Sequence, residues 1–449
     1  MAGDDVKTTR ARDGQPPEAP SDADTADETT NGSGRRHRLR SEALLALEIC
    51  GLAALAFTRP ILDSFGRAPE TFLARGAAPL DVILFALLVA TVPTVVITGV
   101  SAATGLVGAR TRCRAHLAAV GLLGGVAVWR LGSDAAPWGP AVLVLAGVAG
   151  AAILVVVRTK LPSAASYLRL LGAASVVFVV QFLVLSPTAS LATGGGSGGT
   201  DTEAARAVAA ATGDDPPPIV VVVVDAVATS SLLDGSGNID ADLYPELASL
   251  ASGATWYRNH TTTSSWTYEA VPAMLTGQLP KGVVPDVSEY PDNLFTLFAE
   301  SHRIEAVEQI TRLCPADTCR TDDGAALPGL LGDAVGWWRG ALDTGTEGAQ
   351  ILPGVLEPDR GDEFARWIDR QDFSPGSPPG LWFYHLVMPH EPWDVLDDGT
   401  RYDGLAEEPH GLWMHAYWGE TGADVAEQRH LLQTQAVDRM LGDLFAELR

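Results

Sequence analysis

The chain has 449 residues and a formal net charge of −24, and it is long enough for two domains. The segment up to Leu191 contains 17 basic and 14 acidic residues, net +3, whereas the remainder contains 14 basic and 41 acidic residues, net −27. The second half is too acidic to offer the patch of basic side chains that phosphate contacts need. This excludes a nucleic-acid-binding protein and disfavours flat docking on an anionic membrane surface. The charge suits a soluble domain that is exposed to cations.

The amino-terminal segment, residues 1–40, is rich in Asp, Thr, Pro and Gly and shows no apolar periodicity, which predicts a disordered cytoplasmic tail. It ends in a basic cluster, residues 35–40, directly before the first apolar run. A cleaved signal peptide would show a short apolar core and then a small-residue cleavage site, but here the apolar runs continue.

Apolar runs recur through residues 41–191 and predict a membrane domain of five transmembrane helices. Each run is close to the roughly 20 residues that span a bilayer core. The expected helices lie near 42–62, 79–101, 115–132, 138–157 and 168–191. Basic clusters fall in alternate loops, as cytoplasmic loops require, so we expect a multi-pass cell-membrane protein. Its amino terminus would be cytoplasmic and everything after Leu191 extracytoplasmic. The alternative, a set of core helices in a large soluble protein, does not explain these repeated lengths and alternating charges.

A Gly/Ser-rich linker is predicted over 192–217, and an extracytoplasmic α/β domain over 218–449. The patterning of this domain predicts helices and strands in mixed order. We expect helices near 201–212, 243–251, 267–277, 293–300, 333–342, 362–370 and 423–449, and strands near 219–224, 255–257, 304–308 and 381–387.

The run Ile219–Val224 is the strongest strand signal, because an uninterrupted Ile/Val run is typical of a parallel strand buried on both faces. Asp225 follows it at the carboxyl end, where sites lie in open α/β sheets. Thr267 opens a short predicted helix that runs to Gly277, where free N–H groups favour an anion. The plainer interpretations are that Asp225 caps the next turn and that Thr267 is a helix N-cap.

These residues resemble the sulfatase-like branch of the alkaline phosphatase superfamily. In that branch an acid after the first strand binds a metal, and a nucleophile starts a helix about nine residues before a Thr-Gly pair. Thr267 stands at that distance from Thr276-Gly277. Formylglycine sulfatases have Cys or Ser there and Arg four residues on, where this chain has Thr267 and Val271. The pattern is therefore closer to the membrane-anchored phosphoethanolamine transferases and lipoteichoic acid synthases, which keep an unmodified Thr.

The resemblance implies a set of site residues. Thr267 would be the nucleophile, and Asp225 and Thr267 would bind a divalent metal ion of unknown identity (Mn, Mg, Ca or Zn). His390, in the loop after the strand near 381–387, would contact the substrate, and Lys281 could meet an anion. His385 is interpreted as a strand residue. The substrate would be a phosphate or sulfate ester of a lipid or cell-wall polymer, with membrane lipids as partners.

Three departures from the family pattern stand out. The neighbour of Asp225 is Ala226, where the family often has a second acid, and no Asp-His-Gly run completes the metal site. The chain also stops inside the helix predicted to begin at 423, without a C-cap Gly. We therefore expect an α-helical transmembrane domain followed by a sulfatase-like (alkaline phosphatase type) α/β domain that is incomplete at its C-terminal end. With two protein ligands, little or no turnover is expected.

Cys314 and Cys319 flank a short polar loop. A close pair of this kind suggests a small disulfide and hence an oxidising compartment, and the alternatives are two free thiols or half of a metal site.

The sequence as a whole leaves two functions open. One is a metal-dependent hydrolase or phospho-group transferase at the outer membrane face, and the other is a catalytically inactive sulfatase-like membrane protein.

Overall fold

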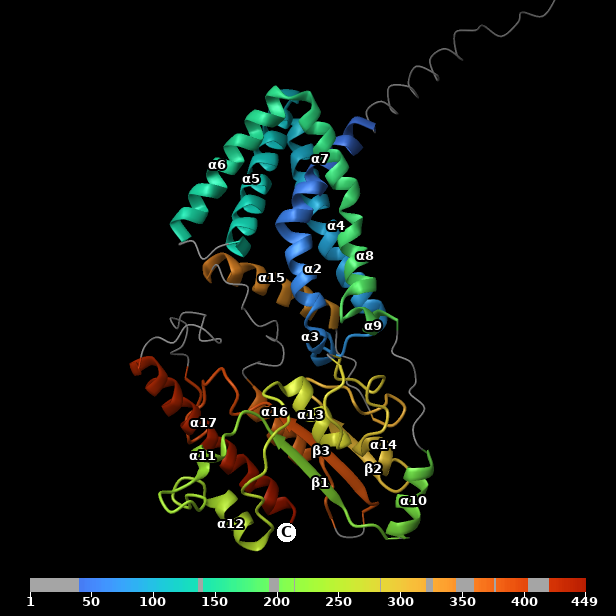
Figure 1. Ribbon diagram of the computed structural model, residues 1–449, viewed down its shortest axis with the longest axis vertical. Coiled ribbons are helices and arrows are strands. Elements are labelled where there is room, and N and C mark those ends of the chain that lie inside the picture. The colour runs from blue at the N-terminus through green and yellow to red at the C-terminus, as the bar shows by residue number, and fades with distance from the viewer. Residues whose placement is uncertain are drawn as a thin grey trace, which may run out of the picture.

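A computed structural model describes residues 40–135, 140–193, 202–213, 215–282, 284–319, 326–344, 359–374, 377–402 and 420–449. The predicted tail, apart from residue 40, and the glycine run 194–199 lie outside these residues. The described chain forms a helical bundle and, below it, a part built on a sheet (Figure 1).

The bundle contains the helices of the amino-terminal half. Its elements are η1 (Ala54–Thr58), α2 (Arg59–Gly66), α3 (Pro69–Ala74), α4 (Pro79–Ala103), η2 (Thr104–Leu106), α5 (Ala109–Ala135), α6 (Pro140–Lys160), α7 (Pro162–Ala174), α8 (Val176–Leu185) and α9 (Ala189–Ala192). Its outer surface is apolar: on α4, Val95 is 67% exposed and Val96 56%. Such a surface is stable only in contact with other apolar groups, as in a bilayer.

Among the described residues, three helical stretches are long and apolar enough to cross a membrane, namely Arg40–Gly66, Pro79–Leu106 and Pro162–Leu185. They indicate membrane association and correspond to the first, second and fifth predicted spans. The predicted spans near 115–132 and 138–157 fall on α5 and α6, several of whose side chains lie outside the described set. Five crossings and their direction remain predictions.

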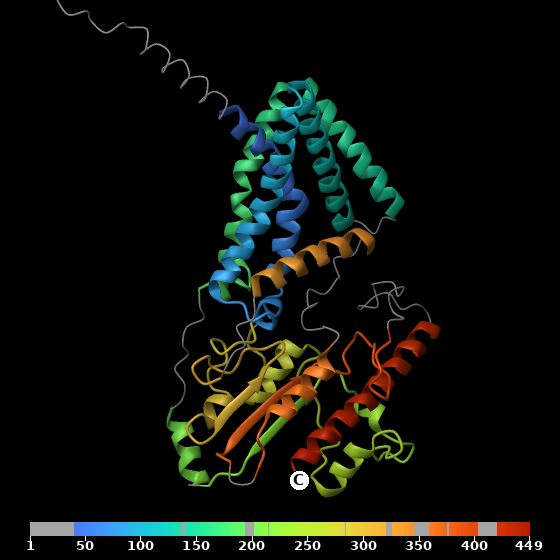
Figure 2. The ribbon, with the colours of Figure 1, turned by 180° about the vertical axis from the view of Figure 1, so that it is seen from behind.

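The sheet part contains a three-stranded parallel sheet of β1 (Ile219–Val224), β2 (Arg303–Val307) and β3 (Gly380–Leu386), in the order β1-β3-β2. Its helices are α10 (Thr202–Thr212), α11 (Thr229–Leu232), α12 (Pro245–Gly253), α13 (Thr267–Thr276), α14 (Leu294–Phe298), α16 (Arg360–Arg370) and α17 (Glu420–Glu447). One further helix, α15 (Ala326–Thr344), crosses the lower end of the bundle (Figure 2).

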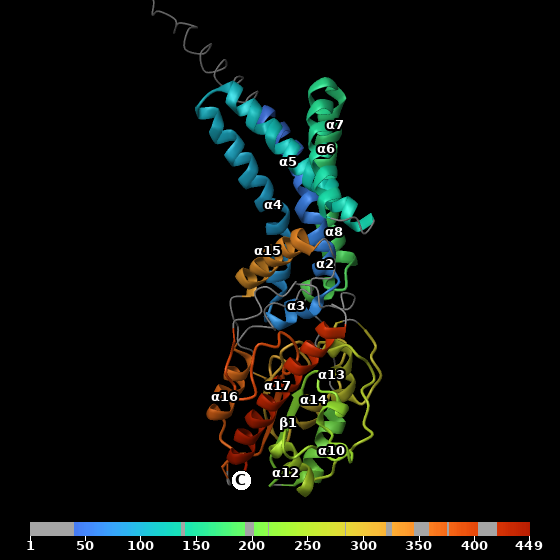
Figure 3. The same ribbon diagram turned by 90° about the vertical axis from the view of Figure 1, so that its left-hand side faces the viewer.

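Helices cover both faces of the sheet, with α16 and α17 on one side and α13 and α14 on the other (Figure 3). Successive side chains of a strand point to opposite faces. The even-numbered residues of β1 pack with α16 and α17, and the odd-numbered ones pack with α13 and α14. On β3, Trp382 and Tyr384 likewise join the first face, and Leu381 and Phe383 the second. This double burial explains the uninterrupted apolar sequence of β1.

Most elements predicted for the second half are confirmed, with boundaries that shift by a few residues. The largest change is α15, which begins at Ala326, seven residues before the predicted start at 333. The strand predicted at 255–257 is wrong, because these residues form no strand. Trp256 is 42% exposed and Tyr257 76% exposed, so their strand-like composition is not used for pairing.

The bundle and the sheet part meet through α3 and α15. Arg75, just after α3, forms a bidentate pair with Asp333 of α15 at 2.9 and 2.8 Å. Phe65 and Phe72 of the bundle share an apolar cluster with Leu330 of α15. These polar and apolar contacts fix α15 against the bundle.

Cys314 and Cys319 form a disulfide, with their Cα atoms 5.9 Å apart. Both are buried in the apolar cluster between the sheet and α13. The disulfide prediction is confirmed, and the alternatives of free thiols and of half a metal site are wrong.

Candidate functional site

Asp225 and Thr267 are brought together at the carboxyl end of β1. Asp225 continues β1, and its N–H donates to the carbonyl of Leu386 at 3.0 Å. Thr267 is the first residue of α13 and follows Trp266, whose side chain does not cap the helix. The Thr267 hydroxyl donates to Asp225 Oδ2 at 3.2 Å and lies 3.4 Å from Oδ1. Thr267 is therefore not an N-cap, and its hydroxyl points to the acid that the sequence paired with it.

His385 is the third member of this group. β1 and β3 are in register with Val223 beside His385, and residue parity places Asp225 and His385 on the sheet face that α13 covers. His385 Nε2 lies 3.8 Å from Asp225 Oδ2. The ring is fully buried, and neither of its nitrogens has a hydrogen-bond partner in the described part of the chain. A buried polar group without a partner is rare and calls for an explanation.

Burial lowers the pKa of His385, although the charge of Asp225 opposes this effect. The imidazole is therefore neutral at physiological pH, and its contact with Asp225 is not an ion pair. A neutral imidazole offers a lone pair and can bind a metal. The interpretation of His385 as a strand residue is confirmed, but sequence reasoning missed its place beside Asp225.

The backbone after Asp225 is held in an uncommon conformation. Ala226 has a φ of 63°, in the left-handed region that residues with a Cβ seldom adopt. Its carbonyl accepts a hydrogen bond from His430 Nε2 of α17 at 2.9 Å. Non-glycine residues in this region cluster at functional sites, where surrounding contacts hold them in place.

The loop after β3, residues 387–392, is organised by a buried arginine. The Arg360 guanidinium donates to the carbonyls of Val387, His390, Glu391 and Pro392. Burial lowers the pKa of Arg360 to about 10, and Asp394 partly opposes this effect. Arg360 therefore stays charged at neutral pH. Gln433 of α17 adds a bond to the His390 carbonyl at 3.0 Å.

His390 thus stands in a fixed loop next to the site. Its Nδ1 donates to the Glu391 carbonyl at 3.0 Å, and its charge contributes to the lowered pKa of His385. Lys281 is exposed and lies beyond the other end of α13 from Thr267. A ten-residue helix is about 15 Å long. No described contact joins the Lys281 side chain to Asp225 or Thr267, so its role stays a prediction.

The side chains that meet at Asp225 provide some of the ligands that a divalent cation needs. A carboxylate, a hydroxyl and a neutral imidazole converge near Asp225 Oδ2, and these are ligand types that such ions accept. Within the described part of the chain, no group of three or more His, Cys, Asp or Glu side chains could hold a metal ion. Asp225 and His385 thus supply two ligands of those classes, and Thr267 adds a hydroxyl.

The end of helix α3 in the bundle packs near the residues that surround Thr267 in the sheet part. Tyr268, the residue after Thr267, packs with Ala74 of α3 against Ile310 and Val387. Glu70 of α3 has a buried Oε2 without a hydrogen-bond partner. Burial raises the pKa of Glu70 to about 7, and its charge contributes to a raised pKa of Tyr268.

We expect Glu70 to make folding stability fall as pH rises. Its pKa is 4.5 in the unfolded chain and about 7 in the folded protein, so the folded state binds more protons between these values. Stability is then lost between pH 4.5 and 7, by roughly 3 kcal/mol at most at 1.36 kcal/mol per pKa unit. Glu70→Gln should raise the unfolding midpoint at pH 8 and leave it unchanged at pH 4. Glu447→Gln, at an exposed carboxyl, is the control. If both variants shift the unfolding midpoint equally at pH 8, the loss of stability with rising pH does not come from Glu70.

The whole chain was compared with models of known protein families, with characterised proteins and with solved structures, and none of the three comparisons finds a match. The resemblance to sulfatase-like enzymes accordingly remains an expectation from the motifs. Functional conclusions depend on the geometry of the site.

Proposed function

We propose that this protein is a membrane-anchored, metal-dependent hydrolase or phospho-group transferase that acts on phosphate or sulfate esters at the outer membrane face. The observation that carries the proposal is the convergence of Thr267 Oγ1 and His385 Nε2 on Asp225 Oδ2, at 3.2 and 3.8 Å. Asp225 and His385 lie at the carboxyl ends of the adjacent parallel strands β1 and β3, where α/β proteins place their sites, and Thr267 reaches them from the start of α13.

Each residue has a distinct part in the proposed reaction. A divalent cation, when bound by Asp225, Thr267 and His385, would lower the pKa of the hydroxyl and neutralise charge on the ester. Thr267 Oγ1 would attack the phosphorus or sulfur while the bond to the ester oxygen breaks, and that oxygen would leave as an alcohol with the proton from Thr267. Water or an acceptor hydroxyl would then displace the phosphoryl or sulfuryl group from Thr267 and restore its hydroxyl. The hydroxyl already donates to Asp225 Oδ2, so this carboxylate is placed to accept its proton. The first N–H groups of α13 would stabilise the developing negative charge.

The alternative is a membrane protein that keeps this part of the fold without turnover. The observation that favours it is the absence, among the described residues, of a third acidic, His or Cys ligand. Catalytic metal sites commonly hold the ion with three protein ligands.

Metal binding and hydrolysis together separate the two proposals. The purified full chain is titrated with Mn²⁺, Mg²⁺, Ca²⁺ and Zn²⁺ by calorimetry, and hydrolysis of bis(p-nitrophenyl) phosphate is followed with and without EDTA. If the protein is a metal-dependent enzyme, we expect saturable binding of one of these ions, which Asp225→Asn should abolish, and hydrolysis that EDTA inhibits. Hydrolysis that EDTA leaves unchanged would refute a metal-dependent enzyme, and binding without hydrolysis would favour the inactive protein.

The proposed orientation has the amino terminus in the cytoplasm and the sheet part outside. The alternating basic clusters support it, and the Cys314–Cys319 disulfide agrees with an oxidising compartment. We expect a reporter that works only outside the cytoplasm to be active when fused after Ala192. A cytoplasm-only reporter fused there should be silent, and its activity would refute five crossings with this orientation.

A further inference from the structure

Two pockets flank α2 at the end of the bundle that faces the sheet part. The larger, about 290 Å³, lies between α2 and α8 and is lined by Leu62, Phe178 and Phe182 among others. The smaller, about 150 Å³, lies between α2 and α5. Both are lined by Arg59, Asp63 and Arg67, which are spaced four residues apart and so share one face of α2.

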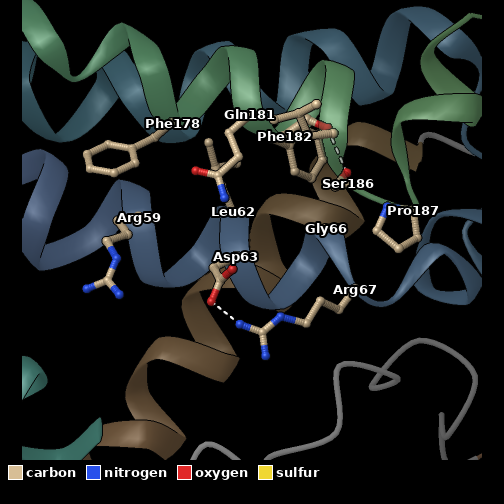
Figure 4. A pocket seen from close by; sticks show the side chains of 11 residues that line it. Arg59, Leu62, Asp63, Gly66, Arg67, Phe178, Gln181, Phe182, Ser186 and Pro187 are labelled. Carbon is tan, nitrogen blue, oxygen red and sulfur yellow. Dashed lines mark hydrogen bonds and ion pairs between the residues drawn. The ribbon is translucent and has the colours of Figure 1, made fainter. Parts of the chain in front are cut away.

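The polar groups of this face carry an excess positive charge. Arg67 forms an ion pair with Asp63, whereas the Arg59 guanidinium has no ion-pair or hydrogen-bond partner among the described residues (Figure 4). The amide of Gln181 also lines the larger pocket. A guanidinium is a strong donor to phosphate oxygens, and an amide can add a hydrogen bond.

The rest of the larger pocket is apolar and is continuous with a lipid-facing surface. On the part of α8 nearer to α7, Val177 is 57% and Val180 52% exposed. The candidate spans Arg40–Gly66 and Pro162–Leu185 both end beside this pocket. The pocket therefore lies at the boundary between hydrocarbon and water, where lipid headgroups meet the protein.

We propose that the groove between α2 and α8 binds a phospholipid with an anionic headgroup from the outer leaflet. Its phosphate would pair with Arg59, and one acyl chain would lie against Phe178 and the valines of α8. This inference is independent of catalysis at Asp225 and Thr267, because it uses no residue of that site.

The test uses the purified full chain in detergent, titrated with dioleoyl phosphatidylglycerol or dioleoyl phosphatidylcholine and followed by native mass spectrometry. The two lipids share their acyl chains and differ in headgroup charge. Both lipids carry the phosphate, but the choline cation of phosphatidylcholine would be repelled by the excess positive charge of this face, so we expect phosphatidylglycerol to bind about tenfold more tightly. Arg59→Gln should remove this preference and Arg59→Lys should keep most of it. Arg114→Gln, which removes an exposed arginine at the opposite end of the bundle, should leave it unchanged.

Two further arms separate a lipid site from a site for soluble anions. Phe178→Ala should weaken the binding of both lipids and keep the preference, and inorganic phosphate at millimolar concentration should not displace phosphatidylglycerol. The proposal is overturned if Arg59→Gln retains the preference while thermal unfolding shows an intact fold, or if Arg59→Lys loses it. It is also overturned if both lipids bind wild-type protein equally or if phosphate competes fully.

Discussion

Replacing Thr267 with alanine is expected to abolish any metal-dependent ester hydrolysis by this protein. The substitution removes the oxygen that would form the new bond, and it also removes one of three candidate metal donors. A loss of at least about a thousandfold follows, which corresponds to about 4 kcal/mol of activation free energy at 1.4 kcal/mol per tenfold. The hydroxyl is partly buried and makes its bond to Asp225, so the cost in stability is that of one hydrogen bond, about 1 kcal/mol.

Thr267→Ser is the matched variant, because it keeps the hydroxyl and loses only a methyl group. It should retain a measurable fraction of the activity, while Thr267→Ala retains none above background. The measurement is the initial rate of bis(p-nitrophenyl) phosphate hydrolysis at saturating metal, with unfolding curves for all three proteins. Equal rates for wild type and Thr267→Ala would place the nucleophile elsewhere. A folded Thr267→Ser variant as inactive as the alanine variant would count against a hydroxyl nucleophile.

Replacing Arg360 with methionine is expected to give the largest loss of stability in the sheet part. The guanidinium is buried and donates to four backbone carbonyls of the loop 387–392. Methionine fills similar space but leaves the carbonyls of Val387 and Pro392 without the donor that Arg360 supplies, whereas Gln433 and His390 still donate to the other two carbonyls. An unpaired buried polar group costs about 1–3 kcal/mol. Because the loop can relax and admit water, we expect a total loss of about 3–5 kcal/mol. His390 lies in this loop, so its position should be lost as well.

Arg366→Met is the matched control on the same helix. Its guanidinium is exposed and pairs with the half-exposed Asp359 at 3.3 Å, and such surface pairs contribute less than about 1 kcal/mol. Denaturant unfolding and amide hydrogen exchange of residues 387–392 should separate the two variants. Arg360→Lys should be intermediate, since one ammonium group cannot reach the set of carbonyls that the planar guanidinium serves. A loss for Arg360→Met no larger than for Arg366→Met would show that the loop does not depend on this residue.

Two residues near this site have buried polar atoms that lower the stability of the folded protein, namely His385 and Glu70. Among the described residues, both ring nitrogens of His385 and one carboxyl oxygen of Glu70, Oε2, are buried without a hydrogen-bond partner, an arrangement that lowers stability. His385 lies beside Asp225 on the sheet face that α13 covers. Glu70 belongs to the bundle, and its charge affects Tyr268, the residue after Thr267.

The sequence by itself determined the features that depend on local pattern. The Ile/Val run that becomes β1, the helix that starts at Thr267 and the apolar stretches of the bundle all follow from periodicity and length, which each segment carries within itself. The close spacing of Cys314 and Cys319 also suggested their bond, and the structure decided it against the alternatives of free thiols and half of a metal site. The pairing of Asp225 with Thr267 was expected only from family resemblance, and the structure places them 3.2 Å apart.

Only the tertiary structure decided which distant residues join them. His385 reaches Asp225 because β3 lies between β1 and β2, and strand order is set by packing across more than 150 residues of sequence. Nothing in the sequence singled out Arg360 or Glu70. The burial of Arg360 depends on the β3 loop, and that of Glu70 Oε2 on the contact between α3 and the sheet part. The 255–257 segment has strand-like residues but no neighbouring strand, so its propensity was overridden. Composition encodes how a segment prefers to fold, whereas the partners of a buried polar group are fixed only when the whole chain packs.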